Sequence, residues 1–345
     1  MITVLSVIKQ GDITMLSQNG IEYVNCNLCG ANDTKLVFWL PVHPQHIGKY
    51  NRDVWNIVRC RRCGLIYENP RPDAAALQYF YTFDNLTDRN FVQDWFVNNA
   101  DLSRTTWQRL LRAMRRYRSS GHLLDVGCGA GSFLVEAGKA GFEVVGQDIT
   151  PFFVDYCRSQ QGLTMYEGKL ENLGLEESSF DCLTAFDVIE HHPDPRSLLA
   201  EMRRIVKPGG LVVIGTHDVG NLFARIYGRH WRHMSAIGHL TYFTRGTLTE
   251  MMETSGFRVV HRGGAHTIDK TFLAEWRNRI VQFFRLIALR AAILGIYKPL
   301  ATQIPILRRW QYQRSGIYLD HPKLLMRAGN QVIMDDNMVL LALAA

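Results

Sequence analysis

The chain has 345 residues, of which 47% are apolar and 21% are charged. These fractions are ordinary for a folded domain and exclude an intrinsically disordered chain. The length predicts two structural units, or one large unit with additions, because single domains usually hold about 100–200 residues. The 39 Lys and Arg residues exceed the 32 Asp and Glu residues by seven, so the charge permits an anionic partner without requiring one.

The amino terminus and the apolar segments indicate where the chain resides. The first nine residues lack a basic region and a small-residue cleavage site, so we expect no secretory signal and a cytoplasmic protein. The longest apolar stretches lie between Phe272 and Leu307, and Arg285, Arg290 and Lys298 interrupt them. An ordinary membrane-spanning helix needs about 20 mostly apolar residues, so none is predicted here.

Two pairs of cysteines predict a metal site near the amino terminus. Cys26 and Cys29 are separated by two residues, and the same spacing separates Cys60 and Cys63. This spacing lets both thiolates of a pair reach one tetrahedral ion, and a glycine after each pair permits the positive φ that such a turn often needs. In a chain expected to be cytoplasmic, such pairs indicate metal rather than disulfides. We therefore predict a structural zinc ion, with redox activity or chance pairing as the alternatives.

The predicted zinc would stabilise a small amino-terminal module. Four sulfur ligands leave no open position for catalysis, and a unit of roughly residues 20–70 has too little core of its own. A module of this kind can bind nucleic acid, substrate or a neighbouring domain. The segment between the cysteine pairs is apolar and aromatic rather than densely basic, which favours a substrate or domain contact; it includes Trp39, Pro41, His43, His46 and Trp55.

The centre of the chain has the pattern of a parallel α/β unit. Residues 123–126 read as a buried strand that runs into a glycine-rich turn, and a helix follows over 132–137. A second apolar strand over 142–148 ends in an acid. Strand, helix and strand in about 25 residues are typical of a doubly wound fold.

The glycine-rich turn and two acids predict a ligand site at the carboxyl ends of these strands. Gly127, Gly129 and Gly131 let the main chain pass close to a ligand. Asp148 ends the second strand, where it can accept hydrogen bonds from both hydroxyls of a ribose. Asp125 precedes the glycines and can hold a cationic, amine-bearing ligand. The glycine spacing alone is a weak signal, because dinucleotide enzymes and packing turns use similar glycines.

Further elements continue the alternation of strands and helices. They are a strand with its exit loop at 180–191, a helix that opens at 193–195 and runs to about residue 206, and strands at 211–215, 256–260 and 337–343.

The ordered set of features resembles the class I S-adenosylmethionine-dependent methyltransferases. The resemblance rests on residues 125–133, Asp148, 180–191 and 207–210, and it covers roughly residues 75–262 plus the last strand. It implies an α/β fold with a doubly wound, seven-stranded Rossmann-like methyltransferase sheet, a small zinc-binding module before it and a helical insertion before the last strand. The expected domains are a zinc-ribbon-like module at 1–70, a helical lid or linker at 71–120, the methyltransferase core at 121–265 plus 335–345, and a basic amphipathic helical insertion at 266–334.

Two flanking segments, 63–72 and 239–248, resemble a bacterial subgroup of these enzymes that carries a zinc knuckle. Similar knuckles occur in deoxysugar C-methyltransferases, and related enzymes act in polysaccharide and natural-product pathways. The resemblance therefore implies methyl transfer to an oxygen or carbon of a small-molecule acceptor. It favours a sugar, a glycoconjugate (lipid-linked forms included) or a natural-product intermediate.

The resemblance also implies S-adenosylmethionine as the cofactor and assigns residues to its site. The methionine end would be lined by Asp125, Gly127, Gly129 and Gly131, and the ribose would be held by Asp148. Ile149 would pack on the adenine, and Leu170 would offer main-chain contacts beside it. Phe186 would lie near the reactive methyl group, and Tyr81, in a lid helix after Pro72, would close over the cofactor.

Three residues are candidates for catalytic contact with the acceptor. His191 matches a histidine common in the family, and it can act as a base, position the acceptor or only hold its loop in place. His239 and Tyr242 come from the loop beyond the fifth strand, which ends near His217. Open α/β sheets usually bind their ligands at this rim, although a structural role is the alternative for each residue.

The segment 270–314 carries nine Lys and Arg residues along an apolar stripe. A basic amphipathic helix can cap an acceptor pocket, which we favour, or it can lie on the anionic inner face of a membrane.

Two other functions compete with a small-molecule methyltransferase. Zinc modules also occur in some RNA methyltransferases that modify guanine, but many base N-methyltransferases carry Asn/Asp-Pro-Pro-Tyr/Phe after the fourth strand, where residues 185–188 read Ala-Phe-Asp-Val. The cysteine module also lacks a concentrated basic track, so we expect no nucleic-acid partner. A non-catalytic cofactor-binding scaffold is the other alternative, because an intact cofactor site does not prove turnover.

Overall fold

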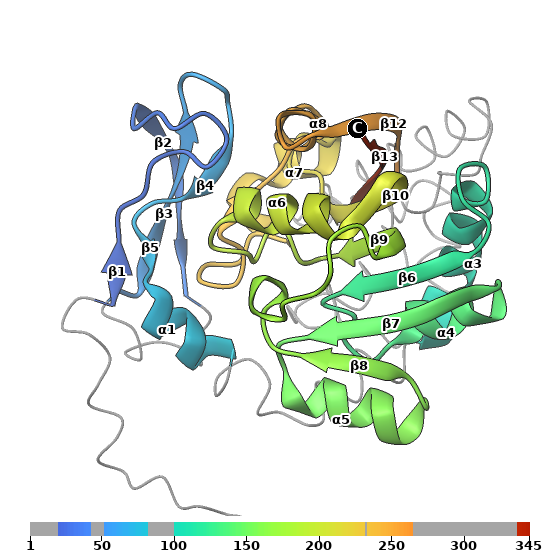
Figure 1. Ribbon diagram of the computed structural model, residues 1–345. Helices are drawn as coiled ribbons and strands as arrows, with labels where there is room; N and C mark the ends of the chain where they lie inside the picture. The colour runs from blue at the N-terminus through green and yellow to red at the C-terminus, as the bar shows by residue number, and fades with distance from the viewer. Residues whose placement is uncertain (1–19, 43–51, 82–99, 232, 265–336) are drawn as a thin grey trace, which may run out of the picture.

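The computed structural model describes residues 20–42, 52–81, 100–231, 233–264 and 337–345 (Figure 1). Strands among these residues form a seven-stranded sheet, a four-stranded sheet and a two-stranded ribbon. Helices flank the largest sheet, and the two smaller sheets lie together to one side of it.

The seven-stranded sheet confirms the predicted doubly wound fold. Its strand order is β12-β13-β10-β9-β6-β7-β8, and its neighbouring strands are parallel except where β13 pairs with β10 and β12. The strand order reverses between β6 and β9, and doubly wound sheets bind ligands at the carboxyl ends of the strands at such a point. The strands are β6 (Gly121–Val126), β7 (Phe142–Asp148), β8 (Thr164–Glu167), β9 (Phe180–Phe186), β10 (Val206–His217), β12 (Phe257–Gly264) and β13 (Asn337–Ala344).

Two apolar layers cover the two faces of this sheet. Leu123 belongs to the cluster that packs against α3 and α4, whereas the next residue, Leu124, belongs to the cluster that packs against α6 and α8. This alternation follows from the two-residue period of a strand, and burial on both faces explains why the central strands are almost continuously apolar. The helices are α3 (Ala100–Met114), α4 (Ser132–Lys139), α5 (Pro151–Gln160), α6 (Pro195–Ile205), α7 (Leu222–Tyr227) and α8 (Arg245–Thr254), with short 3₁₀ turns η5 (Leu170–Asn172) and η6 (Gly228–His230).

The helix predicted to open at 193–195 begins as its sequence indicates. The Asp194 carboxylate accepts hydrogen bonds from the amides of Arg196 and Ser197, and Pro195 occupies the first helical position. An acidic N-cap followed by proline satisfies the unpaired amides of a first turn. Contacts between residues close in sequence therefore account for where α6 begins.

The four-stranded antiparallel sheet forms the cysteine module, and one of its strands, β11, follows β10 of the seven-stranded sheet in the chain. Its order is β11-β4-β3-β2, and a ribbon of β1 and β5 lies beside it. The expected domain boundary at residue 70 falls between β4 and β5, and residues 1–70 alone do not complete the sheet. The elements are β1 (Ile21–Glu22), β2 (Thr34–Pro41), β3 (Val54–Cys60), β4 (Ile66–Glu68), β5 (Arg71–Pro72), β11 (Thr241–Tyr242) and the helix α1 (Ala74–Tyr79).

The module shares its core with the large domain. Leu65 and Tyr67 belong to the same buried cluster as Leu198 of α6. The side-chain amide of Asn27 donates a hydrogen bond of 3.0 Å to the carbonyl of Pro193, just before that helix. This packing agrees with the expectation of a domain contact for the module.

The predicted helical insertion at 266–334, including the basic stretch at 270–314, lies outside the described residues. None of the helices in the described part of the chain combines the length and the apolar composition needed to cross a bilayer.

Candidate functional site

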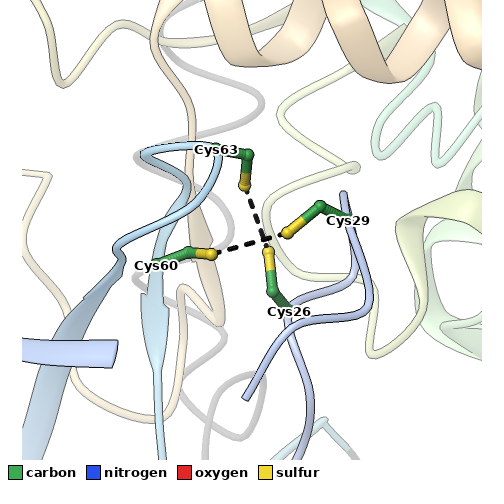
Figure 2. Close-up of side chains that lie close together, drawn as sticks. All are labelled: Cys26, Cys29, Cys60 and Cys63. Carbon is green, nitrogen blue, oxygen red and sulfur yellow. Dashed lines mark hydrogen bonds between the residues drawn. The ribbon is translucent and has the colours of Figure 1, made fainter. Parts of the chain in front are cut away.

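The four predicted metal ligands converge in the cysteine module. Figure 2 shows the sulfur atoms of Cys26, Cys29, Cys60 and Cys63 facing a common centre, and all four lie within 4.8 Å of one another. Two of the sulfur–sulfur separations are 3.4 Å, between Cys26 and Cys63, and 3.5 Å, between Cys29 and Cys60. Four sulfur ligands about 2.3 Å from a zinc ion would lie about 3.8 Å apart. The donor set and the spacing therefore fit a tetrahedral zinc ion.

The main chain of each knuckle forms a tight turn at its second cysteine. Gly30 and Gly64 have φ angles of 75° and 81°, which confirms the predicted left-handed turns. Their amides donate hydrogen bonds to the carbonyls of Cys26 and Cys60 at 2.8 and 3.0 Å. Burial opposes ionisation of Cys60, but the amides of Cys63 and Arg62 outweigh it and lower the pKa of this thiol to about 7, whereas burial raises the pKa of Cys26 to about 11. A thiolate is the form that a metal requires.

The glycine-rich turn after β6 has the backbone that its sequence predicts. Gly127, Gly129 and Gly131 have φ angles of 64°, 53° and 74°, a region that strongly favours glycine. A β-carbon on Gly127 would also lie only 2.5 Å from Cγ2 of Val188. The turn therefore brings bare main chain to the carboxyl end of β6.

Asp148, at the end of β7, is tied to this turn. Its carboxylate accepts hydrogen bonds of 2.9 Å from the amides of Gly129 and Thr150. Burial raises the pKa of Asp148, and these amides act in the opposite direction. Its neighbour Gln147 accepts a hydrogen bond from the amide of Gly127 at 3.0 Å and donates to the carbonyl of Gly168. Sequence reasoning missed this brace by Gln147, because a polar residue in a strand carries no sign of its partner.

Asp125, the last-but-one residue of β6, is a buried acid. Its Oδ1 accepts a hydrogen bond of 2.6 Å from the Thr184 hydroxyl, and only 2% of the residue is exposed. Burial raises the pKa of Asp125 to about 7, assisted by the charge of Asp148 and opposed by the Thr184 hydrogen bond. A cationic ligand beside this carboxyl would favour its ionised form. Asp125 therefore suits a cationic ligand.

The other three predicted cofactor residues near the sheet differ in their surroundings. Ile149 follows Asp148 and is 45% exposed, an apolar surface that an adenine ring could cover. Leu170 begins η5, and its side chain is buried in the core. Phe186 ends β9, and its ring packs 5.0 Å from the rings of Trp107 and Phe133. Trp107 on α3 thus packs against the last residue of β9.

Tyr81 and His191, predicted for different roles, lie in contact. The Tyr81 hydroxyl is 3.2 Å from Nδ1 of His191, and the Gly238 carbonyl is 2.6 Å from the same nitrogen. The shorter contact requires the Nδ1 hydrogen, so Nε2 carries the lone pair of a neutral ring. Burial lowers the pKa of His191, which keeps the ring neutral near pH 7. His191 therefore has the protonation state of a general base.

A group of histidines surrounds a buried acid beside His191. The ring of His239 lies 4.6 Å from that of His191 and 5.1 Å from that of His217. His217 stacks on His233, with ring centroids 3.6 Å apart. Glu190 lies 3.5 Å from Nε2 of His217. Sequence reasoning gave no role to Glu190 or His233, because their neighbours come from separate loops.

Tyr242, the third candidate for contact with the acceptor, is buried. It lies in β11, its side chain is buried, and its hydroxyl donates a hydrogen bond of 3.0 Å to the carbonyl of Ser235. Burial raises the pKa of Tyr242 well above its usual range. These contacts join Tyr242 to the 235–242 loop, and its expected catalytic role stays a prediction.

Comparison with known proteins places the large domain. Residues 99–262 match the family described as a methyltransferase domain. The chain is 28% identical over 203 residues to the biotin biosynthesis bifunctional protein BioHC of Cellvibrio japonicus, across 56% of this chain and 40% of that protein. It is 37% identical over 125 residues to the malonyl-[acyl-carrier protein] O-methyltransferase of Pectobacterium atrosepticum, across 36% of this chain and 49% of that protein. The chain thus spans about half or less of the length of these two relatives.

The chain is also similar to another relative and to a solved structure. The ubiquinone biosynthesis O-methyltransferase of Coxiella burnetii is 27% identical over 165 residues, across 42% of this chain and 67% of that protein. Phosphoethanolamine N-methyltransferase 2 of Haemonchus contortus, solved with S-adenosyl-L-methionine, is 18% identical, with a TM-score of 0.48 over 90% of this chain and 68% of that one.

Proposed function

We propose that this chain, in which residues 99–262 match a methyltransferase domain, uses S-adenosylmethionine to transfer a methyl group to an oxygen or carbon of a small-molecule acceptor. One observation carries the proposal. Asp148 ends β7, and the glycine-rich turn and a neutral His191 follow the carboxyl ends of β6 and β9, where the order of the sheet reverses. A cofactor site and a candidate base thus share one edge of the sheet.

The residues present fit the cofactor. Asp125 would hold the amino group of the methionine moiety, and the turn at 127–131 would pass close to the carboxylate of that moiety. Asp148 would accept hydrogen bonds from the ribose hydroxyls, and the exposed side chain of Ile149 would pack on the adenine. Bound S-adenosylmethionine supplies the methyl group on an electrophilic sulfonium, which leaves the protein to align the acceptor, exclude water and remove one proton.

His191 is the base that we assign to the acceptor. Its Nδ1 hydrogen is directed at the Gly238 carbonyl, so Nε2 would take the proton of an acceptor hydroxyl as the methyl group arrives. The lowered pKa of His191 keeps Nε2 unprotonated at neutral pH. Tyr81, whose hydroxyl lies beside the same ring, would position the imidazole and cover the site from the side of α1.

The cysteine module is assigned a supporting role. A zinc ion held by its four cysteines would have no open position, so the ion would not take part in methyl transfer. The module pairs through β4 with β11, next to the loop that carries His239. We assign it the task of holding that loop against the methyltransferase domain.

The acceptor class follows from weaker observations. Two relatives are named as O-methyltransferases, which favours an oxygen acceptor. The zinc-knuckle segments at 63–72 and 239–248 favour a sugar or glycoconjugate. Residues 185–188 lack the motif of base N-methyltransferases, which disfavours RNA as the acceptor.

Mass spectrometry tests the proposed function. Purified protein is incubated with methyl-labelled S-adenosylmethionine and nucleotide sugars, lipid-linked sugars or RNA, with Asp148→Ala as the matched negative control. We expect label in a sugar with the wild-type protein and much less label with the variant. Label in RNA alone would overturn the acceptor class, and cofactor binding without transfer to any acceptor would support a scaffold instead.

A further inference from the structure

We propose that Glu190, His217 and His239 form a second metal site, which binds a divalent transition-metal ion. One ligand atom from each residue lies within 4.8 Å of the other two. The three residues come from the loop after β9, the end of β10 and the loop before β11. The site is distinct from the cysteine module, and it is formed by the strand ends where the acceptor is expected.

The two histidines are oriented as metal ligands usually are. Nδ1 of His217 lies 2.7 Å from the side-chain oxygen of Asn337, and Nδ1 of His239 lies 2.7 Å from the carbonyl of His233. Each Nδ1 therefore carries the ring hydrogen and donates it, which leaves the lone pair on Nε2. Metal-binding histidines characteristically donate their second ring nitrogen to an oxygen acceptor, which holds the ring in place.

Glu190 supplies the anionic ligand. Only 2% of the residue is exposed, and within the described residues neither carboxylate oxygen makes a hydrogen bond of good geometry. Leaving a buried carboxylate without such a partner is costly. A cation between Glu190 and the two imidazoles would remove that cost, because the carboxylate would then have a positive partner.

The spacing fits a shared ion better than a direct hydrogen bond. Nε2 of His217 and Oε1 of Glu190 are 3.5 Å apart, whereas charge-assisted N–H···O bonds are about 2.7–2.9 Å long. Two ligands that are each about 2.0–2.1 Å from one metal ion lie about 3.0–3.4 Å apart. The observed separation therefore requires only a small adjustment to admit an ion.

Two imidazoles and one carboxylate select the class of metal. This donor set binds zinc, iron(II) and related first-row ions, and three protein ligands leave at least one coordination position open. The cysteine site is different because four sulfur ligands close it. The open position would suit an oxygen of the acceptor, a role that rests on the proposed function, whereas the metal site itself does not.

Cobalt(II) titration of the full-length chain tests the site. After metal removal with a chelator, we expect the wild-type protein to bind about two cobalt ions per chain: one tetrathiolate site with intense sulfur-to-cobalt charge-transfer absorption and one histidine–carboxylate site without it. Glu190→Gln should bind about one ion and keep the charge-transfer absorption. Cys60→Ser should lose that absorption.

His122→Ala is the matched control. His122 is an exposed histidine 2.8 Å from Glu143 at the opposite end of β6, so this variant should bind cobalt as the wild-type protein does. His239→Gln is the second variant if Glu190→Gln fails to fold, as thermal melting would show. The proposal is overturned if the wild-type chain binds only its thiolate ion, or if a folded Glu190→Gln variant still binds both. These readouts are independent of methyl transfer, so an inactive protein would test the proposed function separately.

Discussion

Thr241 pairs with Tyr67 in an antiparallel register, although 174 positions separate them in the chain. Tyr67 lies in the cysteine module, between the second cysteine pair and β5, whereas Thr241 follows the loop that contains His239. The pairing makes β11 the fourth strand of the module's sheet. The strand that directly follows the His239 loop is therefore part of the cysteine module's sheet.

Further contacts hold the same loop from both sides. Glu68 accepts a hydrogen bond of 3.2 Å from the amide of Ile237, and its own amide donates to the Leu240 carbonyl at 2.9 Å. The amides of Leu240 and Thr241 donate to the carbonyl of Glu190 at 2.9 and 3.1 Å. The loop thus connects the module directly to the segment that carries Glu190 and His191.

Cys60→Ser should therefore disturb the methyltransferase site as well as the module. Loss of one ligand should release zinc, and because structural zinc contributes about 10–16 kcal/mol in zinc-finger peptides, the module should unfold. Hydrogen exchange should then become faster at the amides of Ile237, Leu240 and Thr241. Mass spectrometry of exchanged peptides and zinc analysis measure both effects.

Tyr23→Ser is the matched control for that experiment. Tyr23 belongs to the same module and is 77% exposed, so its replacement should change neither zinc content nor loop exchange. If Cys60→Ser loses zinc while the amides of Leu240 and Thr241 keep their protection, the module does not hold the loop.

Tyr242→Phe should leave the rate of methyl transfer nearly unchanged. The substitution removes the hydrogen bond to the Ser235 carbonyl, and such a bond contributes about 1 kcal/mol to the free energy of unfolding. Thermal melting should show that small loss, while steady-state kinetics should give a kcat close to that of the wild-type protein. A large fall in kcat with an unchanged melting temperature would restore the catalytic role that sequence reasoning gave to Tyr242.

His191→Ala, unlike Tyr242→Phe, should lower the rate of methyl transfer strongly. Loss of a general base typically lowers the rate about 100- to 10,000-fold, so kcat should fall while cofactor affinity, measured by calorimetry, stays close to the wild-type value. The neutral ring and its bond to Gly238 are the basis for this expectation. A variant that binds cofactor and retains most of its kcat would assign His191 to holding its loop.

Asp148→Ala should weaken cofactor binding without loss of the fold. Hydrogen bonds to a charged group contribute about 1.5–3 kcal/mol, so the dissociation constant should rise by about 10- to 100-fold. Asp155→Ala is the control, because Asp155 is an exposed acid on α5. Unchanged affinity of the Asp148 variant in calorimetry would remove the ribose assignment.

The doubly wound sheet could be predicted because its signals are local. The glycine turn, the acid that ends β7 and the proline and aspartate that begin α6 each specify their own segment, and their order gives the topology. The cysteine pairs were also readable from spacing alone. These features depend on contacts between residues close in sequence, or on ligand chemistry that requires one arrangement.

The parts that sequence reasoning missed depend on distant contacts. β11 has only two residues, too short for a strand pattern, and it exists because β4 offers an unpaired edge. Glu190 meets His217 and His239 only after three loops converge at the sheet's edge. No residue near Tyr242 in the sequence indicates that its hydroxyl is directed at Ser235. A local pattern cannot show which loops meet.

Cofactor affinity should rise with pH because of Asp125. In the free protein the pKa of this buried carboxyl is about 7, so below pH 7 it is increasingly protonated, whereas a bound cationic amine favours the ionised form. The complex then binds fewer protons than the free protein, and linkage requires affinity to increase as pH rises toward 7. The expected slope below that value is about tenfold per pH unit, and affinity should fall again above about pH 8 as the α-amino group of the ligand loses its proton.

Calorimetry between acidic and mildly alkaline pH measures this dependence, with Asp125→Asn as the comparison. Asparagine has nearly the same shape and can accept the hydrogen bond from Thr184, but it does not titrate. The variant should bind more weakly at neutral pH and lose the rise in affinity on the acidic side. If affinity rises with pH below 7 to the same extent in both proteins, another group titrates and Asp125 does not face the amine.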